Sequence, residues 1–144
     1  MTPQDRARAC SDLMWAHDRA SQALGMRIDA VGPGTATLSM PVRDDMLNGH
    51  GMCHGGMIFT LADSAFAFAC NTYNALTVAQ SNQITYLAPG AANDTLTATA
   101  TEVARVGRSG TYDVVVTNTA GDKIALFRGQ SRTIKGQHFD EDTA

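Results

Sequence analysis

The sequence is poor in lysine and in charge generally, and this scarcity narrows the range of partners. Lys123 and Lys135 are its only lysines, and charged residues make up 17% of the 144 residues. The 11 basic side chains are outnumbered by 14 acidic ones, which gives a formal net charge of −3 at pH 7. Because a protein that follows nucleic-acid phosphates needs a basic stripe, we expect no nucleic-acid partner.

Cysteine is also scarce, and the N-terminal segment lacks an uninterrupted apolar stretch. Cys10, Cys53 and Cys70 form an odd and widely spaced set, unlike a disulfide framework or a paired-cysteine zinc site. Asp5 and Asp12 interrupt the first residues, so we expect no signal peptide. These absences favour a reducing compartment, and we expect the protein in the cytoplasm.

No apolar run is long enough to cross a membrane. The longest, residues 57–70, contains Asp63 and is shorter than the roughly 20 apolar residues of a transmembrane helix. It is apolar on nearly every face, so we predict a helix buried within protein. With 44% hydrophobic residues, the chain can bury a core, and its length fits one domain.

The remaining patterns predict the other elements of the fold. Helical spacing starts after the capping residue Thr2 and stops at Gly25, which predicts one amphipathic helix. Alternation over residues 26–30 and 35–40 predicts a hairpin. Four more strands, separated by turn residues, are predicted at 77–87, 95–104, 111–118 and 123–133.

These elements define an α+β domain in which a curved antiparallel sheet covers a long central helix. We divide the chain into an N-terminal helix (1–24), the main domain (25–134) and a polar tail (135–144) that we expect to be frayed. Leu96, Ala98 and Ala100 are predicted to face the helix. A sheet this short leaves apolar surface and open edges, so we expect a homodimer.

A glycine-rich loop, residues 48–56, runs directly into the central helix. The first amide groups of a helix have no internal partner and lie at its positive end. The N–H groups of Gly55 and Gly56 therefore suit an oxygen that carries negative charge, as in an oxyanion hole. The alternative is a plain glycine-rich turn, because the pattern matches neither dinucleotide nor Walker fingerprints.

Asp63 is the most conspicuous residue of the central helix, because a carboxylate is costly to bury without a partner or a task. Helical spacing places it on a small, polar face. That face comprises Gly56, Thr60, Asp63, Ser64, Ala67 and Asn71. The alternative is a stripe that touches solvent or satisfies Asp63 through local hydroxyls.

His50, Cys53 and His54 invite two further interpretations that we disfavour. A zinc site would need another group of ligands, and the sequence has no second cluster to supply them. A Cys53–His54 nucleophile pair is disfavoured because adjacent side chains rarely point at each other. We therefore expect no metal and no cofactor, Cys53 in a packing role, and His17 and His138 on the surface.

Three motifs together resemble the hotdog-fold acyl-CoA thioesterases, and most closely their phenylacetate-degradation (PaaI-type) branch. They are Asn48-Gly49-x-Gly51-x-x-His54-Gly55-Gly56, Leu61-Ala62-Asp63 and Ile84-Thr85-Tyr86-Leu87-x-Pro89. The late segment from Gly121 to Ser131, which includes residues 125–129, also resembles this branch, and the resemblance extends from about Leu24 to Thr133. It implies a hotdog fold, dimers that share a continuous sheet, and pairing of dimers into tetramers.

The resemblance also implies roles for individual residues. The Gly55 N–H would polarise the thioester carbonyl, and His54 would lie beside that carbonyl. Asp63 would be nucleophile or general base, and Asn48 would orient the water or the carboxylate. Members with Glu at the Asp63 position often have Thr one turn later, where this chain has Ala67, so the water must be positioned by another residue.

The predicted function is hydrolysis of an acyl-CoA thioester, of the phenylacetyl-CoA or hydroxyphenylacetyl-CoA type, through a mixed anhydride or through activated water. The alternatives are a hotdog hydratase or dehydratase that uses His54 for proton transfer, and a non-catalytic acyl-CoA-binding protein. Arg105 and Arg108, in a predicted turn, are candidates for binding CoA phosphates, although they also fit solvated turn charges.

Helix geometry predicts that two subunits share each active site. Gly55 and Asp63 are eight residues apart, so their Cα atoms lie roughly 12 Å apart along the helix. One thioester cannot meet both groups, because each must come within about 3 to 3.5 Å of the reacting atoms. An antiparallel partner helix would bring its own Asp63 beside Gly55.

Overall fold

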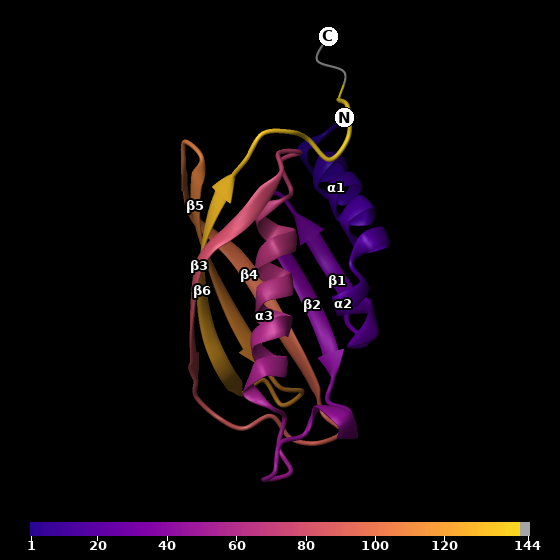
Figure 1. Ribbon diagram of the computed structural model, residues 1–144, viewed down its shortest axis with the longest axis vertical. Helices are drawn as coiled ribbons and strands as arrows, with labels where there is room; N and C mark the ends of the chain where they lie inside the picture. Colours follow the sequence, from indigo (N-terminus) through magenta and orange to yellow (C-terminus); the bar gives the residue numbers. More distant parts are fainter. Residues whose placement is uncertain (142–144) are drawn as a thin grey trace.

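The computed structural model describes residues 1–141 and shows a single sheet wrapped around one long helix (Figure 1). The elements in chain order are α1 (Pro3–His17), α2 (Arg19–Ala23), β1 (Arg27–Gly32), β2 (Thr35–Pro41), the short 3-10 helix η1 (Asp44–Met46), α3 (Gly55–Cys70), β3 (Thr77–Tyr86), β4 (Thr95–Val106), β5 (Ser109–Thr117) and β6 (Lys123–Thr133). The α+β class, the central helix and all predicted strands are therefore confirmed.

The sheet has six strands in the order β1-β2-β4-β5-β6-β3, and all neighbouring strands are antiparallel. Helix α3 contacts every strand, while α1 packs beside β1 at one edge of the sheet (Figure 1). Strand β3 forms the other edge, and most of its residues are exposed. This arrangement is the hotdog fold that the sequence motifs implied.

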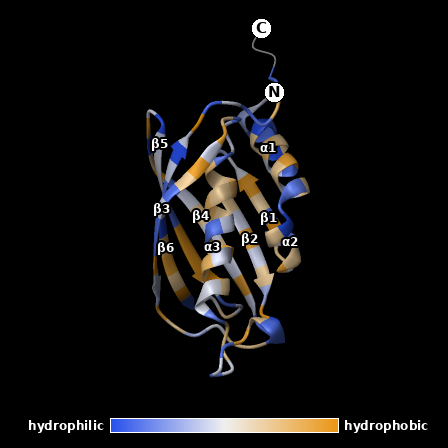
Figure 2. Cartoon of the chain, viewed as in Figure 1, coloured by the Kyte–Doolittle hydropathy of each residue, from blue (hydrophilic) through white to orange (hydrophobic). Residues whose placement is uncertain are grey.

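The core lies between α3 and the face of the sheet that curves around it. The predicted inward-facing set Leu96, Ala98 and Ala100 is confirmed, since all three are 0% exposed. Figure 2 shows hydrophobic residues along most of α3. At Gly129 of β6 a Cβ atom would lie 2.7 Å from the Phe66 ring, so glycine is needed there for the helix to approach the sheet.

The N-terminal helix differs from the prediction, because it is broken in two at Asp18. Asp18 ends α1 and caps α2, and its carboxylate accepts hydrogen bonds from the Ser21 N–H at 3.0 Å and the Ser21 hydroxyl at 2.7 Å. A side chain that competes for backbone N–H groups favours a cap over a helix interior. Periodicity alone does not reveal such a break.

The prediction of a frayed tail was wrong for the residues that the structure describes, and His138, expected on the surface, is half-buried. The His138 ring lies 2.9 Å from the Asn71 Oδ1 atom, and burial lowers the pKa of its imidazole. Glu141 forms an ion pair with Arg6 of α1, and Asn74 binds the backbone of Phe139. The tail therefore fastens α1 to the loop after α3, and residues 142–144 lie outside the described residues.

No helix within residues 1–141 combines the length and the apolar character that crossing a bilayer requires. The central helix α3, the most apolar of the chain, is 16 residues long.

Candidate active site

The loop before α3 is organised by Asn48. Its side-chain oxygen accepts hydrogen bonds from the backbone N–H groups of His50 at 2.9 Å and Met52 at 3.2 Å. Gly51 has a φ of 76°, a conformation that favours glycine. The Asn48 Oδ1 atom thus fixes the backbone of residues 50–52. The Asn48 Nδ2 group makes no hydrogen bond within residues 1–141.

His54 caps the N-terminus of α3 through its ring. The Gly56 N–H donates a hydrogen bond of 2.9 Å to His54 Nδ1. In the neutral ring an accepting Nδ1 requires the proton on Nε2, so the hydrogen-bond network assigns the Nε2–H tautomer. This leaves one ring N–H donor available at the start of the helix.

The two predicted oxygen-binding amides, Gly55 and Gly56, have different roles. The Gly56 N–H is occupied by His54. The Gly55 N–H makes no hydrogen bond within the described part of the chain, and it lies at the positive end of a 16-residue helix. Gly55 alone therefore has the free, directed donor that an oxyanion needs.

A hollow of about 330 Å³ opens beside Gly55. It lies between the 48–53 loop, the first turns of α3 and the segment after β3. Its walls are mostly apolar and comprise Asn48, Met52, Cys53, Gly55, Ile58, Tyr86, Leu87, Ala88 and Pro89. The predicted packing role of Cys53 is confirmed, because the residue is buried and burial raises the pKa of its thiol.

Asp63 lies two turns further along α3 and does not line this hollow. Burial raises the pKa of its carboxyl above the ordinary value, and a hydrogen bond from Asn82 opposes this shift. The bond runs from Asn82 Nδ2 to Asp63 Oδ1 and measures 3.1 Å. Asn82 was missed in the sequence, although its position on β3 alternates with outward-facing residues and so predicts an inward side chain.

The other members of the polar face on α3 are satisfied elsewhere. The Thr60 hydroxyl donates to the Gly56 carbonyl at 2.8 Å, and the Ser64 hydroxyl lies 2.8 Å from that of Ser21 in α2. Neither hydroxyl binds Asp63, whose partner Asn82 comes from the sheet, so the alternative in which local hydroxyls satisfy Asp63 is wrong.

The structure does not bring Arg105 and Arg108 near Gly55 of the same chain. Both lie at the β4–β5 turn, where Arg105 stacks 3.4 Å above the Tyr73 ring centre and 3.8 Å from the Glu102 carboxylate. Tyr73 follows the C-terminus of α3, whose 16 residues span roughly 24 Å. The Arg105 contacts explain its position without a ligand.

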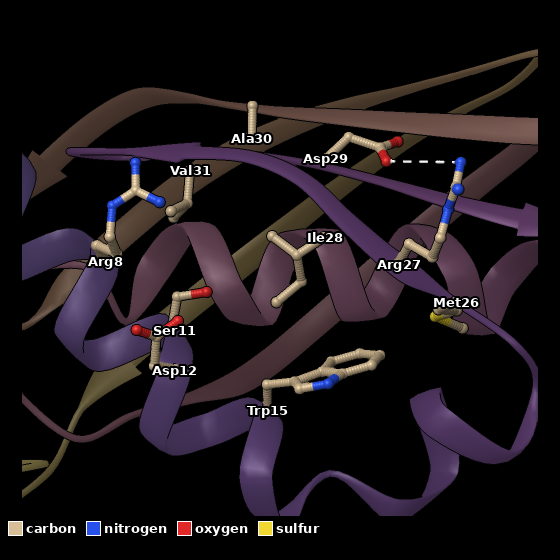
Figure 3. Close-up of a pocket in the computed structure, with 10 residues that line it drawn as sticks. All are labelled: Arg8, Ser11, Asp12, Trp15, Met26, Arg27, Ile28, Asp29, Ala30 and Val31. Carbon is tan, nitrogen blue, oxygen red and sulfur yellow. Dashed lines mark ion pairs between the residues drawn. The ribbon is translucent and has the colours of Figure 1, made fainter.

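Two further features of the structure bear on ligand binding. Among residues 1–141, no group of three or more His, Cys, Asp or Glu side chains is arranged to hold a metal ion. A larger hollow, about 510 Å³, lies between α1 and β1, away from the predicted site. Figure 3 shows the Trp15 indole below Ile28, with Arg8 at one end of this hollow and Arg27 at the other.

Comparison with known proteins identifies the family. Residues 50–125 match the thioesterase superfamily. The acyl-coenzyme A thioesterase PaaI of Escherichia coli K12 is 45% identical over 123 residues, which cover 85% of this chain and 88% of that protein. A putative esterase of Archaeoglobus fulgidus is 38% identical over 82% of this chain and 77% of that protein.

Solved structures agree with this match. The E. coli PaaI protein of the phenylacetic acid degradation operon has a TM-score of 0.93 at 41% identity, covering 94% of this chain and 99% of that chain. A hypothetical thioesterase from Streptococcus pneumoniae with coenzyme A has a TM-score of 0.78 at 25% identity, covering 88% and 96%. The family and fold predicted from the motifs are confirmed: the chain belongs to the thioesterase superfamily of hotdog-fold thioester hydrolases.

Proposed function

We propose that this thioester hydrolase cleaves arylacetyl-CoA thioesters, of the phenylacetyl-CoA or hydroxyphenylacetyl-CoA type, to the free acid and CoA. The observation that carries the proposal is the Gly55 N–H at the start of α3, which has no hydrogen-bond partner among residues 1–141 and lies beside a largely apolar hollow of about 330 Å³. The names of the E. coli relatives, an acyl-coenzyme A thioesterase and a protein of phenylacetic acid degradation, support the substrate class.

The start of α3 would stabilise the transition state. When a nucleophile attacks the thioester carbon, the carbonyl oxygen gains negative charge. The Gly55 N–H and the positive helix end then bind it more strongly than they bind the substrate carbonyl. One such donor contributes about 2.7 to 4 kcal/mol. The Nε2–H of His54 would be a second donor to the same oxygen.

Asp63 would supply the base or the nucleophile. Burial raises the pKa of its carboxyl, which makes the ionised form a stronger base than an exposed aspartate. Attack by Asp63 on the carbonyl carbon would expel CoA thiolate and give a mixed anhydride, which water then hydrolyses. Alternatively, Asp63 would take a proton from water as the water oxygen attacks the same carbon, and loss of CoA thiolate would give the acid directly. Both routes use the same carboxylate, held by Asn82 at 3.1 Å.

Each active site would combine Gly55 of one subunit with Asp63 of another, since roughly 12 Å separates the two residues along one helix. Strand β3 supports such a dimer because it is an unpaired sheet edge with exposed apolar residues, among them Val78 at 47% exposure. Antiparallel pairing of two β3 strands would extend the sheet across both subunits. The pairing of dimers into tetramers remains a prediction.

The geometry of His54 argues against the hydratase alternative. A hydratase base must accept a proton at a free ring nitrogen. Here Nδ1 already accepts the Gly56 N–H, and Nε2 carries the remaining proton. His54 can therefore donate a hydrogen bond in its capping position but has no free nitrogen to act as a base.

Thiol release from a panel of CoA esters tests the proposal. The panel contains phenylacetyl-CoA, hydroxylated phenylacetyl-CoAs and straight-chain acyl-CoAs, with an enoyl-CoA as the hydratase substrate. We expect the highest kcat/KM with the arylacetyl esters. Preferred hydrolysis of straight-chain esters would refute the substrate class, and hydration of the enoyl-CoA without thiol release would refute hydrolysis. Binding without any turnover would indicate the non-catalytic alternative.

A further inference from the structure

Tyr86, the last residue of β3, contacts the first residue of α3 from across the fold. Its hydroxyl donates a hydrogen bond of 2.8 Å to the Gly55 carbonyl oxygen. The ring also lies against Gly55, where an added Cβ atom would be 3.2 Å from both Cζ and the hydroxyl oxygen of Tyr86. Both residues line the 330 Å³ hollow. The Tyr86 side chain therefore packs directly against Gly55, the residue whose N–H is the proposed oxyanion donor.

The hydrogen bond from Tyr86 comes from outside α3 and adds to the bonds that hold the Gly55–Gly56 peptide unit within the helix. The Gly55 carbonyl and the Gly56 N–H belong to the same planar amide. One end of this amide accepts from Tyr86 at 2.8 Å, and the other donates to His54 Nδ1 at 2.9 Å. The two bonds polarise the amide in the same sense, and together they fix the rotation of its plane.

Two consecutive glycines make this fixation necessary. Gly55 and Gly56 form the first turn of α3, and glycine has the widest conformational freedom of any residue. The preceding amide, which carries the Gly55 N–H, is held through the His54 carbonyl, which accepts from Met57 N–H at 2.9 Å. Gly55 thus lies between two fixed peptide planes, and Tyr86 provides the only one of these contacts that comes from the sheet.

We propose that Tyr86 is a positioning residue of the thioesterase site. Its hydroxyl holds the Gly55–Gly56 amide so that the Gly55 N–H and the Nε2–H of His54 point to one carbonyl oxygen. This inference rests on the proposed function of Gly55. Tyr86 transfers no proton, because its hydrogen is directed at the Gly55 carbonyl. Burial raises the pKa of the Tyr86 phenol, so it remains a donor throughout the neutral range.

The test compares Tyr86→Phe with Tyr73→Phe in the full-length enzyme. Both variants lose one hydroxyl and its hydrogen bond, but Tyr73 binds Glu102 at 2.9 Å, near the other end of α3. We expect Tyr86→Phe to lower kcat by about ten- to a hundredfold with little change in KM, because a small displacement of an oxyanion donor is costly. Tyr73→Phe should stay within about twofold of wild type.

Two readouts separate positioning from a general loss of stability. The carbonyl stretching frequency of a bound ketone analogue, with CH₂ in place of the thioester sulfur, reports polarisation by Gly55. We expect its downshift to shrink in Tyr86→Phe only. Hydrogen exchange of the Gly56 amide requires no ligand, and we expect it to be at least about tenfold faster in Tyr86→Phe.

The outcomes distinguish this inference from the proposed function. Wild-type kcat together with an unchanged carbonyl frequency and unchanged Gly56 exchange in Tyr86→Phe would overturn the role of Tyr86 while leaving hydrolysis intact. A wild-type enzyme that releases no thiol from any ester would refute the proposed function, and the exchange measurement would still decide whether Tyr86 fixes the amide. A lower melting temperature with normal kcat would also overturn the role.

Discussion

Replacing Asp63 by Asn removes the charge of one half-buried carboxylate while keeping its size. Asp63 accepts one hydrogen bond, from Asn82 Nδ2 at 3.1 Å, and a side-chain amide oxygen can accept the same bond. We therefore expect Asp63→Asn to fold normally. An amide is neither a base nor a nucleophile near neutral pH, so the chemical step would lose the proton acceptor or attacking group that we propose for Asp63.

The expected loss of activity follows from the value of a positioned base. General-base catalysis contributes about 10²- to 10⁴-fold, or about 2.7 to 5.4 kcal/mol of the barrier. The Gly55 donor and the His54 cap stay in place, so substrate binding should change little. We expect kcat of Asp63→Asn to fall by at least about a hundredfold with KM near the wild-type value.

The assay is thiol release under saturating acyl-CoA, with Asp122→Asn as a control that neutralises an exposed turn carboxylate outside the site. Thermal unfolding checks the fold. Because burial raises the pKa of Asp63, this carboxyl favours the folded state most below its unfolded pKa, and that contribution is lost as the pH rises through its folded pKa. Asp63→Asn should thus melt like wild type at low pH and at a higher temperature at pH 7. Unchanged turnover would remove Asp63 from the mechanism.

Three further predictions follow from other contacts. Asn82→Ala removes the hydrogen bond that opposes the burial-induced rise in the pKa of Asp63, so the acid limb of the pH profile of kcat should move to higher pH. Gln83→Ala, on the outer face of β3, should leave this limb in place. An acid limb that does not move in Asn82→Ala would mean that Asn82 has no influence on the pKa of Asp63. Gly129→Ala should destabilise the protein by about 1 to 3 kcal/mol in urea unfolding, since a Cβ atom would lie 2.7 Å from Phe66, and an unchanged midpoint would show that the ring can move aside. Subunits with Asp63→Ala, refolded together with subunits blocked by Gly55→Val, should regain part of the activity in hybrid dimers; proven hybrids as inactive as their parents would place both residues in one subunit's site.

The sequence was most informative where the determinants are local. The buried helix, the alternating strands and the loop from Asn48 to Gly56 each follow from periodicity, from turn residues or from an unusual residue in an apolar context. The strand ends were off by only a residue or two. The β4–β5 turn is shorter than predicted because Gly107, with a φ of 60°, allows a tight reversal.

The contacts that were missed join residues far apart in the chain. Asn82 reaches Asp63 across 19 positions, and Tyr86 reaches Gly55 across 31. Tyr86 was noted only as part of a motif, and Asn82 was not considered. Neither the register of β3 nor its placement beside α3 is encoded in a local pattern. The tail was misjudged for the same reason, since Glu141 meets Arg6 across 135 positions.

Asn82 and Tyr86, the two site residues that the sequence analysis did not identify, both lie on β3. This edge strand therefore combines an open sheet edge with two contacts to the proposed site. Its outer edge is unpaired in one chain, and its inward side chains hold Asp63 and Gly55. An exposed edge strand is among the parts of a fold that open most easily. In the proposed dimer, pairing of two β3 strands would order Asn82 and Tyr86 at the same time as it brings the two helices together. Assembly and organisation of the active site would then depend on the same strand.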